Sequence, residues 1–477
     1  MNRRKFLKTA AALTAGAGCH GGAVCRHASA AANPAASPQA ETAARKPNFV
    51  VIFIDDMGYG DIEPFGSKVN RTPCLNRMAE EGMKLTSFYV GGTPCTPSRA
   101  ALMTGCYAAR VGLQGGVCFP GFDWGLNPDE ITIAEVLKGV GYATGCFGKW
   151  HLGDQPSLMP DKQGFDYYFG IPYSNDMWIG GNRKYPPLPL LRNREVVGQV
   201  NTPEAQSMLC KQFTDESVEF IRRNKDKPFF VYVPHAFIHN PRHARKEFMD
   251  RAGDATQAVI EETDWSVGQI LDILVELKLD KNTLVIFTSD NGGAGGTSNA
   301  PLRGGKGGPP YEGHYREPTI AWWPGHVPAG TVCDEITSTI DLLPTFARLA
   351  GAGAPADRKI DGGDIAPLLR GAKGATSPHK AFFCKGQSVR EGKWKLLKVQ
   401  KTTELYDLDA DIGEKNNIAD KHPDVVKHLE ELLRAHLEDL EKNSRPRAKV
   451  PDAKPIIPKS MDAQEPAAER KKARKKE

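Results

Sequence analysis

Hydrophobic residues run without interruption through two short segments that both end in oxygen-bearing side chains. Residues 47–54 have the sequence PNFVVIFI, and residues 283–289 have the sequence TLVIFTS. A continuous run of β-branched and aromatic residues predicts a strand that is buried on both faces, as in a parallel sheet. In an open α/β sheet, ligands bind at the carboxyl ends of the strands. We therefore expect a site formed by the residues that follow the two segments, which are Asp55, Asp56, Asp290 and Asn291.

Around these segments the hydrophobic residues recur at helical spacing. Strands that alternate with helices predict an α/β fold, in which helices cover both faces of a large, mostly parallel sheet. The expected helices cover residues 72–82, 132–141 and 255–279, and a further strand covers residues 227–233.

The pattern changes again after about residue 370, where short apolar segments predict an antiparallel sheet. These segments lie at residues 381–383, 389–399 and 404–408, and a helix is expected over residues 423–440. A single hydrophobic core rarely grows beyond roughly 250–300 residues, and this chain has 477. We therefore expect two domains, a large one over residues 46–370 and a smaller C-terminal α+β domain over residues 371–444.

The two ends of the chain differ in composition from the body between them. Residues 1–45 place Arg3 and Arg4 ahead of a short apolar run, which predicts a twin-arginine-type signal peptide and linker. The run is too short to span a bilayer, so we expect an exported protein, periplasmic or secreted, without stable membrane insertion. Residues 445–477 are rich in Lys, Arg, Pro and Ala, which predicts a basic disordered tail.

The net charge of +5 comes from these two ends. Residues 1–45 hold six Lys and Arg against one Glu, and residues 445–477 hold eleven against five acidic residues. The body between them therefore carries a net charge of −6. This distribution does not favour a nucleic-acid partner.

The four residues after the two strands are hard oxygen donors, which suit Ca²⁺ or Mg²⁺ rather than metals that need His or Cys. A single acid at a strand end more often caps a helix or faces solvent. Two matching pairs favour a metal site instead. The adjacent carboxylates of Asp55 and Asp56 also repel each other unless a cation lies between them.

Residues 95–105, CTPSRAALMTG, contain the pattern CxPxR followed by Thr-Gly. Taken alone, Cys95 would more simply be a structural or disulfide cysteine. The whole segment, however, resembles the signature of the type I sulfatases, in which a formylglycine-generating enzyme modifies the cysteine during synthesis. The resemblance covers residues 46–440 and is greatest to arylsulfatase A-like enzymes. It implies an alkaline-phosphatase-like fold for the large domain.

The resemblance also implies the reaction. Cys95 would become formylglycine, an aldehyde whose hydrate attacks sulfur with one hydroxyl and later expels sulfate with the other. A serine ester of sulfate would need attack by water, whereas this ester collapses through its own second hydroxyl. A metal ion lowers the pKa of the hydrate, and the resemblance implies Ca²⁺, with Mg²⁺ second, bound by the four oxygen donors and the modified Cys95. The substrate would be a sulfated small molecule or glycan, and we favour a carbohydrate.

The segment GCFGKWHLG resembles the second signature of the same family. Lys149 and His151 are two residues apart, so they lie on the same side of an extended backbone. The resemblance implies that Lys149 contacts the sulfate and the nucleophile, and that His151 is the base at the hydroxyl that eliminates sulfate. Arg99 and Lys306, which lies in the glycine-rich segment LRGGKGG, would offset the charge of the transferred sulfuryl group.

Three histidines, His235, His239 and His243, follow the strand at residues 227–233. Their spacing suits zinc only on a helix, and Pro241 interrupts one. The family pattern places a substrate-facing histidine directly before an x-Pro pair, as at His239. The resemblance therefore implies that His239 donates a proton to the leaving oxygen, with His235 as the competing assignment.

Residues 170–176 resemble an active-site loop of the arylsulfatase A branch, so Ser174 and Asp176 are expected to bind substrate. Two other functions stay open. The same fold and metal would serve a phospho- or phosphonate-ester hydrolase, and a non-catalytic binder of sulfated glycans would keep the pocket. The complete set from Cys95 to Lys306 favours the sulfatase over a binder, because a binder needs no modifiable nucleophile.

Overall fold

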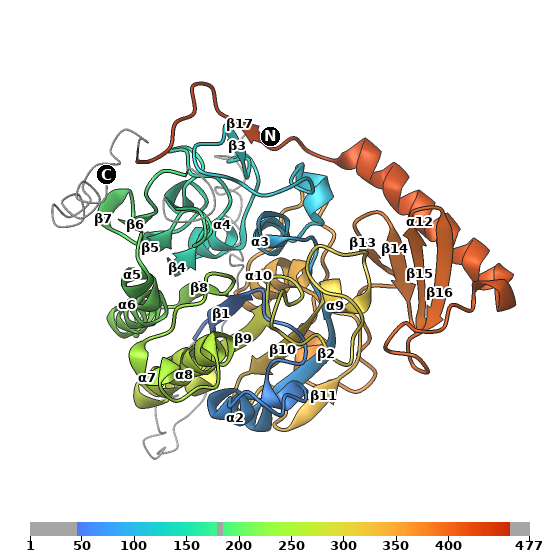
Figure 1. Ribbon diagram of the computed structural model, residues 1–477, viewed down its shortest axis with the longest axis horizontal. Coiled ribbons are helices and arrows are strands. Elements are labelled where there is room, and N and C mark those ends of the chain that lie inside the picture. Colours follow the sequence, from blue (N-terminus) through green and yellow to red (C-terminus); the bar gives the residue numbers. More distant parts are fainter. Residues whose placement is uncertain (1–44, 179–184, 458–477) are drawn as a thin grey trace, which may run out of the picture.

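The computed structural model describes residues 45–178 and 185–457 (Figure 1). Within them, an 11-stranded sheet has the order β11-β2-β10-β9-β1-β8-β4-β5-β6-β7, with β12 paired to β2. Its strands are β1 (Asn48–Asp55), β2 (Met83–Tyr89), β4 (Ala143–Lys149), β5 (Tyr167–Ile171), β6 (Pro189–Arg192), β7 (Glu195–Gln199), β8 (Phe229–Ile238), β9 (Thr283–Ser289), β10 (Arg316–Trp322), β11 (Thr331–Cys333) and β12 (Thr337–Ser338).

The centre of this sheet confirms the parallel arrangement expected from the two apolar segments. Every residue of β1 is buried, and β1 pairs in parallel with β8 on one side and β9 on the other. Ile54 lies opposite Ser289, so the carboxyl ends of β1 and β9 lie side by side. The sheet is mixed overall, because β10 runs antiparallel between β9 and β2 and the strands β6 and β7 are antiparallel at one edge.

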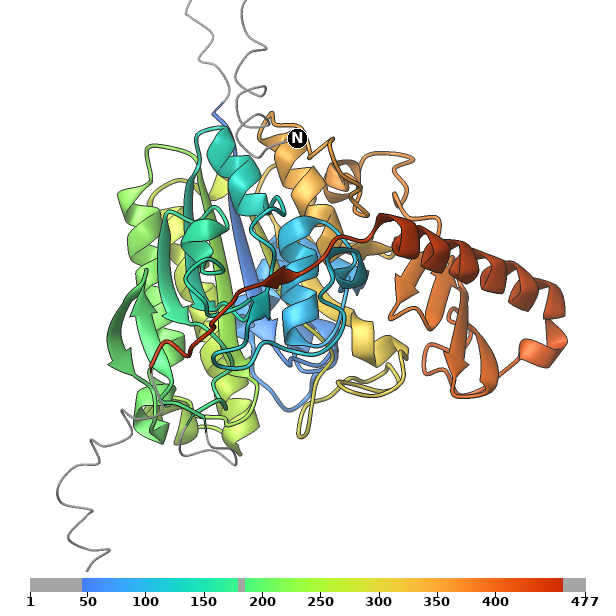
Figure 2. The same ribbon diagram turned by 90° about the horizontal axis from the view of Figure 1, so that it is seen from above.

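Helices cover both faces of the sheet (Figures 1 and 2). Val50, Ile52 and Ile54 pack in one core with α2, α6 and α8, while alternate residues of β1 pack in a second core with α3, α4 and α10. This is the layered α/β fold that the alternation of strands and helices predicts. The helices are α2 (Pro73–Glu81), α3 (Cys95–Thr104), α4 (Ile133–Gly139), α6 (Leu209–Arg223), α8 (Ala255–Glu276) and α10 (Leu342–Leu349), with the shorter α5 (Pro203–Ser207), α7 (Lys246–Met249), α9 (Glu312–Tyr315) and α11 (Ala366–Leu369).

The C-terminal part contains the predicted antiparallel sheet, in the order β13-β14-β15-β16, and the predicted final helix (Figure 1). The buried side chain of Lys395 joins this sheet to the large domain, because its Nζ lies 2.8 Å from Glu312. The elements are β13 (Phe382–Cys384), β14 (Ser388–Glu391), β15 (Trp394–Val399), β16 (Thr402–Asp407) and α12 (Pro423–Asn443).

After α12 the chain runs back across the large domain, and we call residues 445–457 the C-terminal strap (Figure 2). Its strand β17 (Ala448–Lys449) pairs with β3 (Trp124–Gly125), and the Arg445 guanidinium donates to the Glu130 carboxylate at 2.7 and 3.0 Å. The prediction that disorder begins at residue 445 is therefore wrong for the strap. A tail composition does not reveal backbone pairing with a distant segment.

The rest of the expected tail, residues 458–477, and residues 1–44 of the expected signal peptide and linker lie outside the described residues. Within the part of the chain that the structure describes, no helix is both long enough and apolar enough to cross a membrane.

Candidate active site

Four oxygen donors meet at the carboxyl ends of β1 and β9, as the two sequence segments predict. Ligand atoms of three of them and the Cys95 sulfur lie within 4.8 Å of one another, and all of these residues are buried. Asn291 donates its Nδ2 to Asp56 at 2.7 Å, which leaves its Oδ1 facing Cys95 Sγ at 4.0 Å. Such a cluster of hard donors fits a divalent cation such as Ca²⁺. The donors are Asp55, Asp56, Asp290 and Asn291.

The carboxylates of this cluster differ in how well the protein neutralises them. Burial would raise the pKa of Asp55, but the positive charges of Lys149 and Arg99 hold it well below its usual range. Burial and the negative charge of Asp55 raise the pKa of Asp290 to about 7. The ionised form of Asp290 is therefore poorly solvated in the buried cluster, and a bound cation would stabilise it.

Arg99 lies behind these carboxylates instead of on the cavity surface. Its side chain is fully buried, and its Nη2 lies 3.0 Å from Asp55 and 3.0 Å from Asp290. The sequence predicts that Arg99 offsets charge on the sulfuryl group, and in the structure its guanidinium bridges two carboxylates of the cluster. The reason is its position one turn into α3, on the face of the helix that packs against the sheet.

Cys95 is the first residue of α3 and lies above the carboxylate cluster. Its Sγ is 3.4 Å from Asp55 Oδ1 and 3.8 Å from Lys306 Nζ. Burial and the charge of Asp55 raise the pKa of the thiol far above its usual range. An unmodified Cys95 would therefore be a protonated, weak nucleophile at neutral pH.

Lys149 ends β4 and reaches the same cluster as Cys95. Its Nζ pairs with Asp55 and donates to Ser174 Oγ at 3.1 Å. Lys306 comes from the opposite side, with its Nζ 2.7 Å from Asp56. Both lysines therefore place positive charge near the Cys95 sulfur.

The ring of His151 has one nitrogen committed to the protein and one without a described partner. Its Nε2 lies 3.0 Å from the Cys118 carbonyl oxygen, so Nε2 carries the proton. The buried Nδ1 has no hydrogen-bond partner among the described residues. Burial and the charge of Lys149 place the pKa of the ring well below its usual value. His151 is therefore neutral, with an available lone pair on Nδ1.

The structure separates the two histidines that competed for the role of proton donor. His239 borders the cavity, with its Nε2 3.8 Å from Asp56. His235 is fully buried away from the cavity, and its Nε2 bonds to Ser266 Oγ at 3.0 Å. His243 is also absent from the described cavity lining. The geometry therefore favours His239 over His235.

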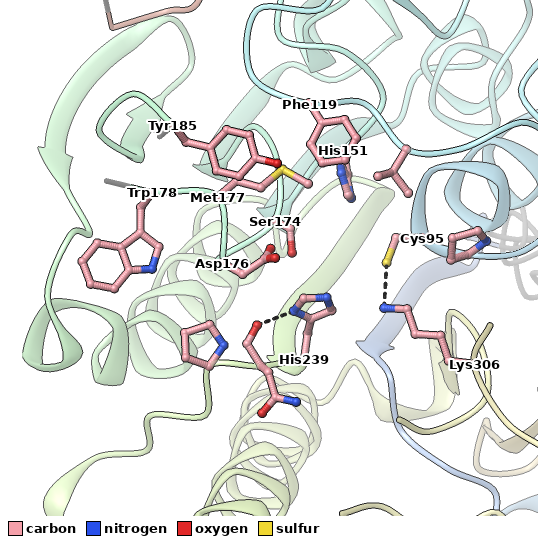
Figure 3. Close-up of a pocket in the computed structure, with 14 residues that line it drawn as sticks. Cys95, Phe119, His151, Ser174, Asp176, Met177, Trp178, Tyr185, His239 and Lys306 are labelled. Atoms are coloured by element: carbon pink, nitrogen blue, oxygen red, sulfur yellow. Dashed lines mark hydrogen bonds between the residues drawn. The ribbon is translucent and has the colours of Figure 1, made fainter. Parts of the chain in front are cut away.

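A cavity of about 790 Å³ opens above this cluster (Figure 3). Its inner end, which we call the charged floor, is lined by Cys95, His151, His239 and Lys306, with the carboxylates and Lys149 beneath. The predicted Ser174 and Asp176 also line the cavity. The structure thus gathers all the predicted site residues except Arg99 on or directly under one surface.

Sequence reasoning missed the other side of the cavity, which we call the aromatic wall. It consists of side chains from two loops. Figure 3 shows Met177, Trp178 and Tyr185 on the side of the cavity away from Cys95 and Lys306, with Phe119 beside His151. A signal existed in the first loop, where the segment CFPGFDW is unusually rich in aromatic residues. The wall residues are Val117, Phe119, Met177, Trp178 and Tyr185.

Comparisons with known proteins agree with this geometry. The sequence model of the Sulfatase family matches residues 47–352, and that of the N-sulphoglucosamine sulphohydrolase C-terminal region matches residues 310–443. The chain is 37% identical to arylsulfatase A of Homo sapiens, over 83% of this chain and 89% of the relative. It is 38% identical to N-acetylgalactosamine-6-sulfatase of Sus scrofa, over 73% of this chain and 70% of the relative.

Solved structures show the same similarity. The crystal structure of Ps i-CgsB in complex with k-i-k-neocarrahexaose superimposes with a TM-score of 0.73 at 31% sequence identity. The match covers 84% of this chain and 94% of that one. The similarity therefore includes both the large sheet and the C-terminal domain.

Proposed function

The chain belongs to the type I sulfatase family, whose members are sulfuric ester hydrolases, and we propose that it hydrolyses sulfated carbohydrates with a formylglycine nucleophile and a calcium ion. The observation that carries the proposal is the convergence of Cys95 with four oxygen donors, two lysines and two histidines at one end of a cavity. This set combines a modifiable nucleophile, a cation site and anion-binding groups within contact distance.

The residues at this end of the cavity fit both a formylglycine and a calcium ion. Formylglycine made from Cys95 by a formylglycine-generating enzyme would supply a hydrated aldehyde as the nucleophile, which the protonated thiol cannot provide. Calcium bound by the four oxygen donors would lower the pKa of that nucleophile and polarise the sulfuryl oxygens. The raised pKa of Asp290, a buried carboxyl beside Asp55, supports a cation at this position.

The roles of His151 and His239 as base and acid follow from which ring nitrogen of each carries a proton. Nδ1 of neutral His151 is an acceptor, which suits the predicted base. His239 directs Nδ1 at the Asn240 carbonyl, so Nε2 faces the site. Because Nδ1 donates to that carbonyl, Nε2 carries a proton only in the imidazolium form of the ring. Burial, with the charge of Lys149, lowers the pKa of His239 and makes this imidazolium a stronger acid toward a leaving oxygen.

Lys149 and Lys306 supply fixed positive charge where negative charge develops on the sulfuryl oxygens. Both lie in a largely buried region, where such interactions are stronger than in water. Arg99 acts indirectly, since it orients Asp55 and Asp290.

The test uses the full chain co-expressed with the formylglycine-generating enzyme. Peptide mass spectrometry across Cys95 should show the aldehyde, and turnover of 4-nitrophenyl sulfate should disappear with EDTA and return with Ca²⁺. Cys95→Ala protein is the matched control and should be inactive. The aldehyde without sulfate release but with phosphonate-ester turnover would support the phosphoester hydrolase instead. Unmodified Cys95 without any turnover would favour the glycan binder.

We also propose that the protein is exported and that its domains divide at residues 46–370 and 371–444. Mass spectrometry of the mature protein from its host should find an N-terminus near residue 31, after the small residues Ala28, Ser29 and Ala30. A mature protein that retains Arg3 and Arg4 would contradict export through a cleaved signal peptide.

A further inference from the structure

The aromatic wall is a braced surface whose rings support one another. The rings of Phe119 and Tyr185 are nearly parallel, with 5.9 Å between centroids and 13° between planes. Phe119 also packs edge to face against Phe122, with centroids 5.2 Å apart. Buried Met177 and half-buried Trp178 extend the apolar surface (Figure 3). The wall is therefore ready to contact an apolar part of a ligand before the ligand arrives.

Hydrogen-bonding side chains lie on the same cavity surface as these rings. Asp176 is exposed, and in Figure 3 it lies between Trp178 and the charged floor. Asn240 borders the cavity on the side of His239. A purely apolar ligand would cover the Asp176 carboxylate without a donor for it, and leaving a charged group unpaired is costly.

The cavity has more room than a sulfate group needs. Its volume of about 790 Å³ is within the range of sites that enclose most of a small organic ligand. The charged floor occupies only its inner end, so the wall and Asp176 contact the organic part of the ester. A sugar ring combines an apolar C–H face with hydroxyl donors at its edge, which matches both surfaces at once.

Resting on the proposed function, we infer that the aromatic wall and Asp176 form a subsite for the pyranose ring of the sulfate ester. The C–H face of the ring packs on Phe119 and Tyr185, and ring hydroxyls donate to Asp176. These residues distinguish a sugar sulfate from an aryl or steryl sulfate, because only the sugar satisfies the carboxylate. A polar site that loses a hydroxyl partner discriminates strongly against the ligand that lacks it.

The test compares two substrates on variants of the full, modified protein. kcat/KM is measured for 4-nitrophenyl sulfate and for a panel of monosulfated galactose and glucose esters, from the release of inorganic sulfate. With Asp176→Ala, the loss on the best sugar ester should exceed the loss on the aryl ester by about tenfold. Phe119→Ala should also lower kcat/KM for the sugar ester by about tenfold.

Phe383→Ala is the matched control, because Phe383 also stacks on another ring, that of His436, but is absent from the described lining of this cavity. It should retain the wild-type preference between the two esters. Equal losses on both substrates with Asp176→Ala would overturn the inference. Turnover of the aryl ester with none of any sugar ester would overturn it while leaving the sulfatase proposal intact.

A binding measurement separates the subsite from the chemistry. Cys95→Ala protein cannot form formylglycine, and calorimetric titration with the same esters reports binding alone. We expect the sugar ester to bind more tightly than 4-nitrophenyl sulfate, and Asp176→Ala in this background to remove the difference. Equal affinities in the parent Cys95→Ala protein would overturn the inference, whatever the turnover experiments show about the proposed function.

Discussion

The charged floor and the aromatic wall enclose the same cavity but are built in different ways. Most floor residues sit at or directly after the ends of β1, β4, β8 and β9 or in the first turn of α3, and Lys306 lies in the loop between β9 and α9. Ion pairs with almost no solvent exposure hold them, including the bridge from Arg99 to Asp55 and Asp290. The wall residues lie on loops, and ring packing holds them.

The wall loop that carries Phe119 is secured by chain segments far away in sequence. Thr96 Oγ1 accepts from the Cys118 backbone N–H at 3.1 Å, which ties this loop to α3. At the other end of the loop, the Val450 N–H donates to the Asp123 carbonyl at 2.6 Å. The comparison of floor and wall shows that the reacting groups are positioned mainly by a rigid sheet edge. The contacts to the organic part of the substrate depend instead on loops that other chain segments hold in place. Variants of the floor should therefore affect all sulfate esters alike, and variants of the wall should affect them unequally.

The largest effect is expected from Arg99→Met, which leaves the buried carboxylates of Asp55 and Asp290 unpaired. Breaking a buried ion pair from one side lowers the free energy of unfolding by about 3–5 kcal/mol. Misplacing the charged groups of such a site should lower kcat by roughly 10²–10³-fold or more on both aryl and sugar esters. Denaturant unfolding and steady-state kinetics measure the two losses.

Arg110→Met is the matched control for this variant. Arg110 is equally buried and pairs with Asp361 and Asp439 at 2.6 Å each, but it is absent from the described cavity lining. It should lose stability while keeping turnover per folded molecule. If Arg99→Met kept normal turnover, the floor would not depend on this bridge.

The second effect concerns the C-terminal strap and separates the wall from the floor. A chain that ends at residue 444 loses the Arg445 to Glu130 ion pair and the pairing of β17 with β3. The Phe119 loop should then shift, and a displacement of about 1 Å in a site can cost up to roughly 10²-fold in rate. We expect a rise in KM that is larger for sugar esters, and faster amide hydrogen exchange over residues 113–123.

A chain that ends at residue 457 keeps the strap and serves as the control for this truncation. It should match the full chain in kinetics and in hydrogen exchange. Full activity and unchanged exchange in the shorter chain would show that the wall does not depend on the strap.

A smaller effect is expected from Ser174→Ala, at the border between the floor and the wall. Ser174 Oγ accepts a hydrogen bond from Lys149 at 3.1 Å. Losing one partner of a charged donor costs about 1–2 kcal/mol, so kcat/KM should fall about five- to thirtyfold. Because Lys149 belongs to the floor, the loss should be equal for aryl and sugar esters. A loss confined to sugar esters would place Ser174 in the wall instead.

The same contrast explains how much of the molecule could be predicted from its sequence. The runs at residues 47–54 and 283–289 place Asp55 and Asp290 at one sheet edge, because a buried parallel strand has a direct signature in hydrophobicity. The floor residues from Cys95 to Lys306 sit in short motifs, so family resemblance locates them. Local sequence does not state which face of α3 carries a side chain into the sheet, so the bridge from Arg99 to Asp55 and Asp290 could not be predicted.

The wall and the strap depend on contacts between segments far apart in the chain. Phe119 and Tyr185 stack although 66 positions separate them in the sequence, and loops have no periodicity from which such a pair could be derived. The C-terminal strap could not be predicted from the sequence for another reason. The Lys- and Arg-rich composition of residues 445–477 favours disorder, whereas the pairing of Val450 with Asp123 depends on backbone groups that composition does not describe.

The smallest expected effect is on the pH dependence of thermal stability, through a buried ion pair near α3. His379 Nε2 lies 2.7 Å from Asp341, the last residue of a short 3-10 helix, Thr339–Asp341, that packs against α3. Burial opposes the charged ring, but the carboxylate of Asp341 outweighs it and raises the pKa of His379 above its usual value. A raised pKa in the folded state contributes stability that is fully present below the unfolded value of about 6.5. That contribution is lost as pH rises through the folded pKa.

Wild-type protein should therefore lose more thermal stability than His379→Gln between about pH 6 and pH 9. Activity per folded molecule at neutral pH should be the same in both, because His379 supports the floor without lining the cavity. Parallel stability curves for the two proteins would show that the pair adds nothing to the support of α3.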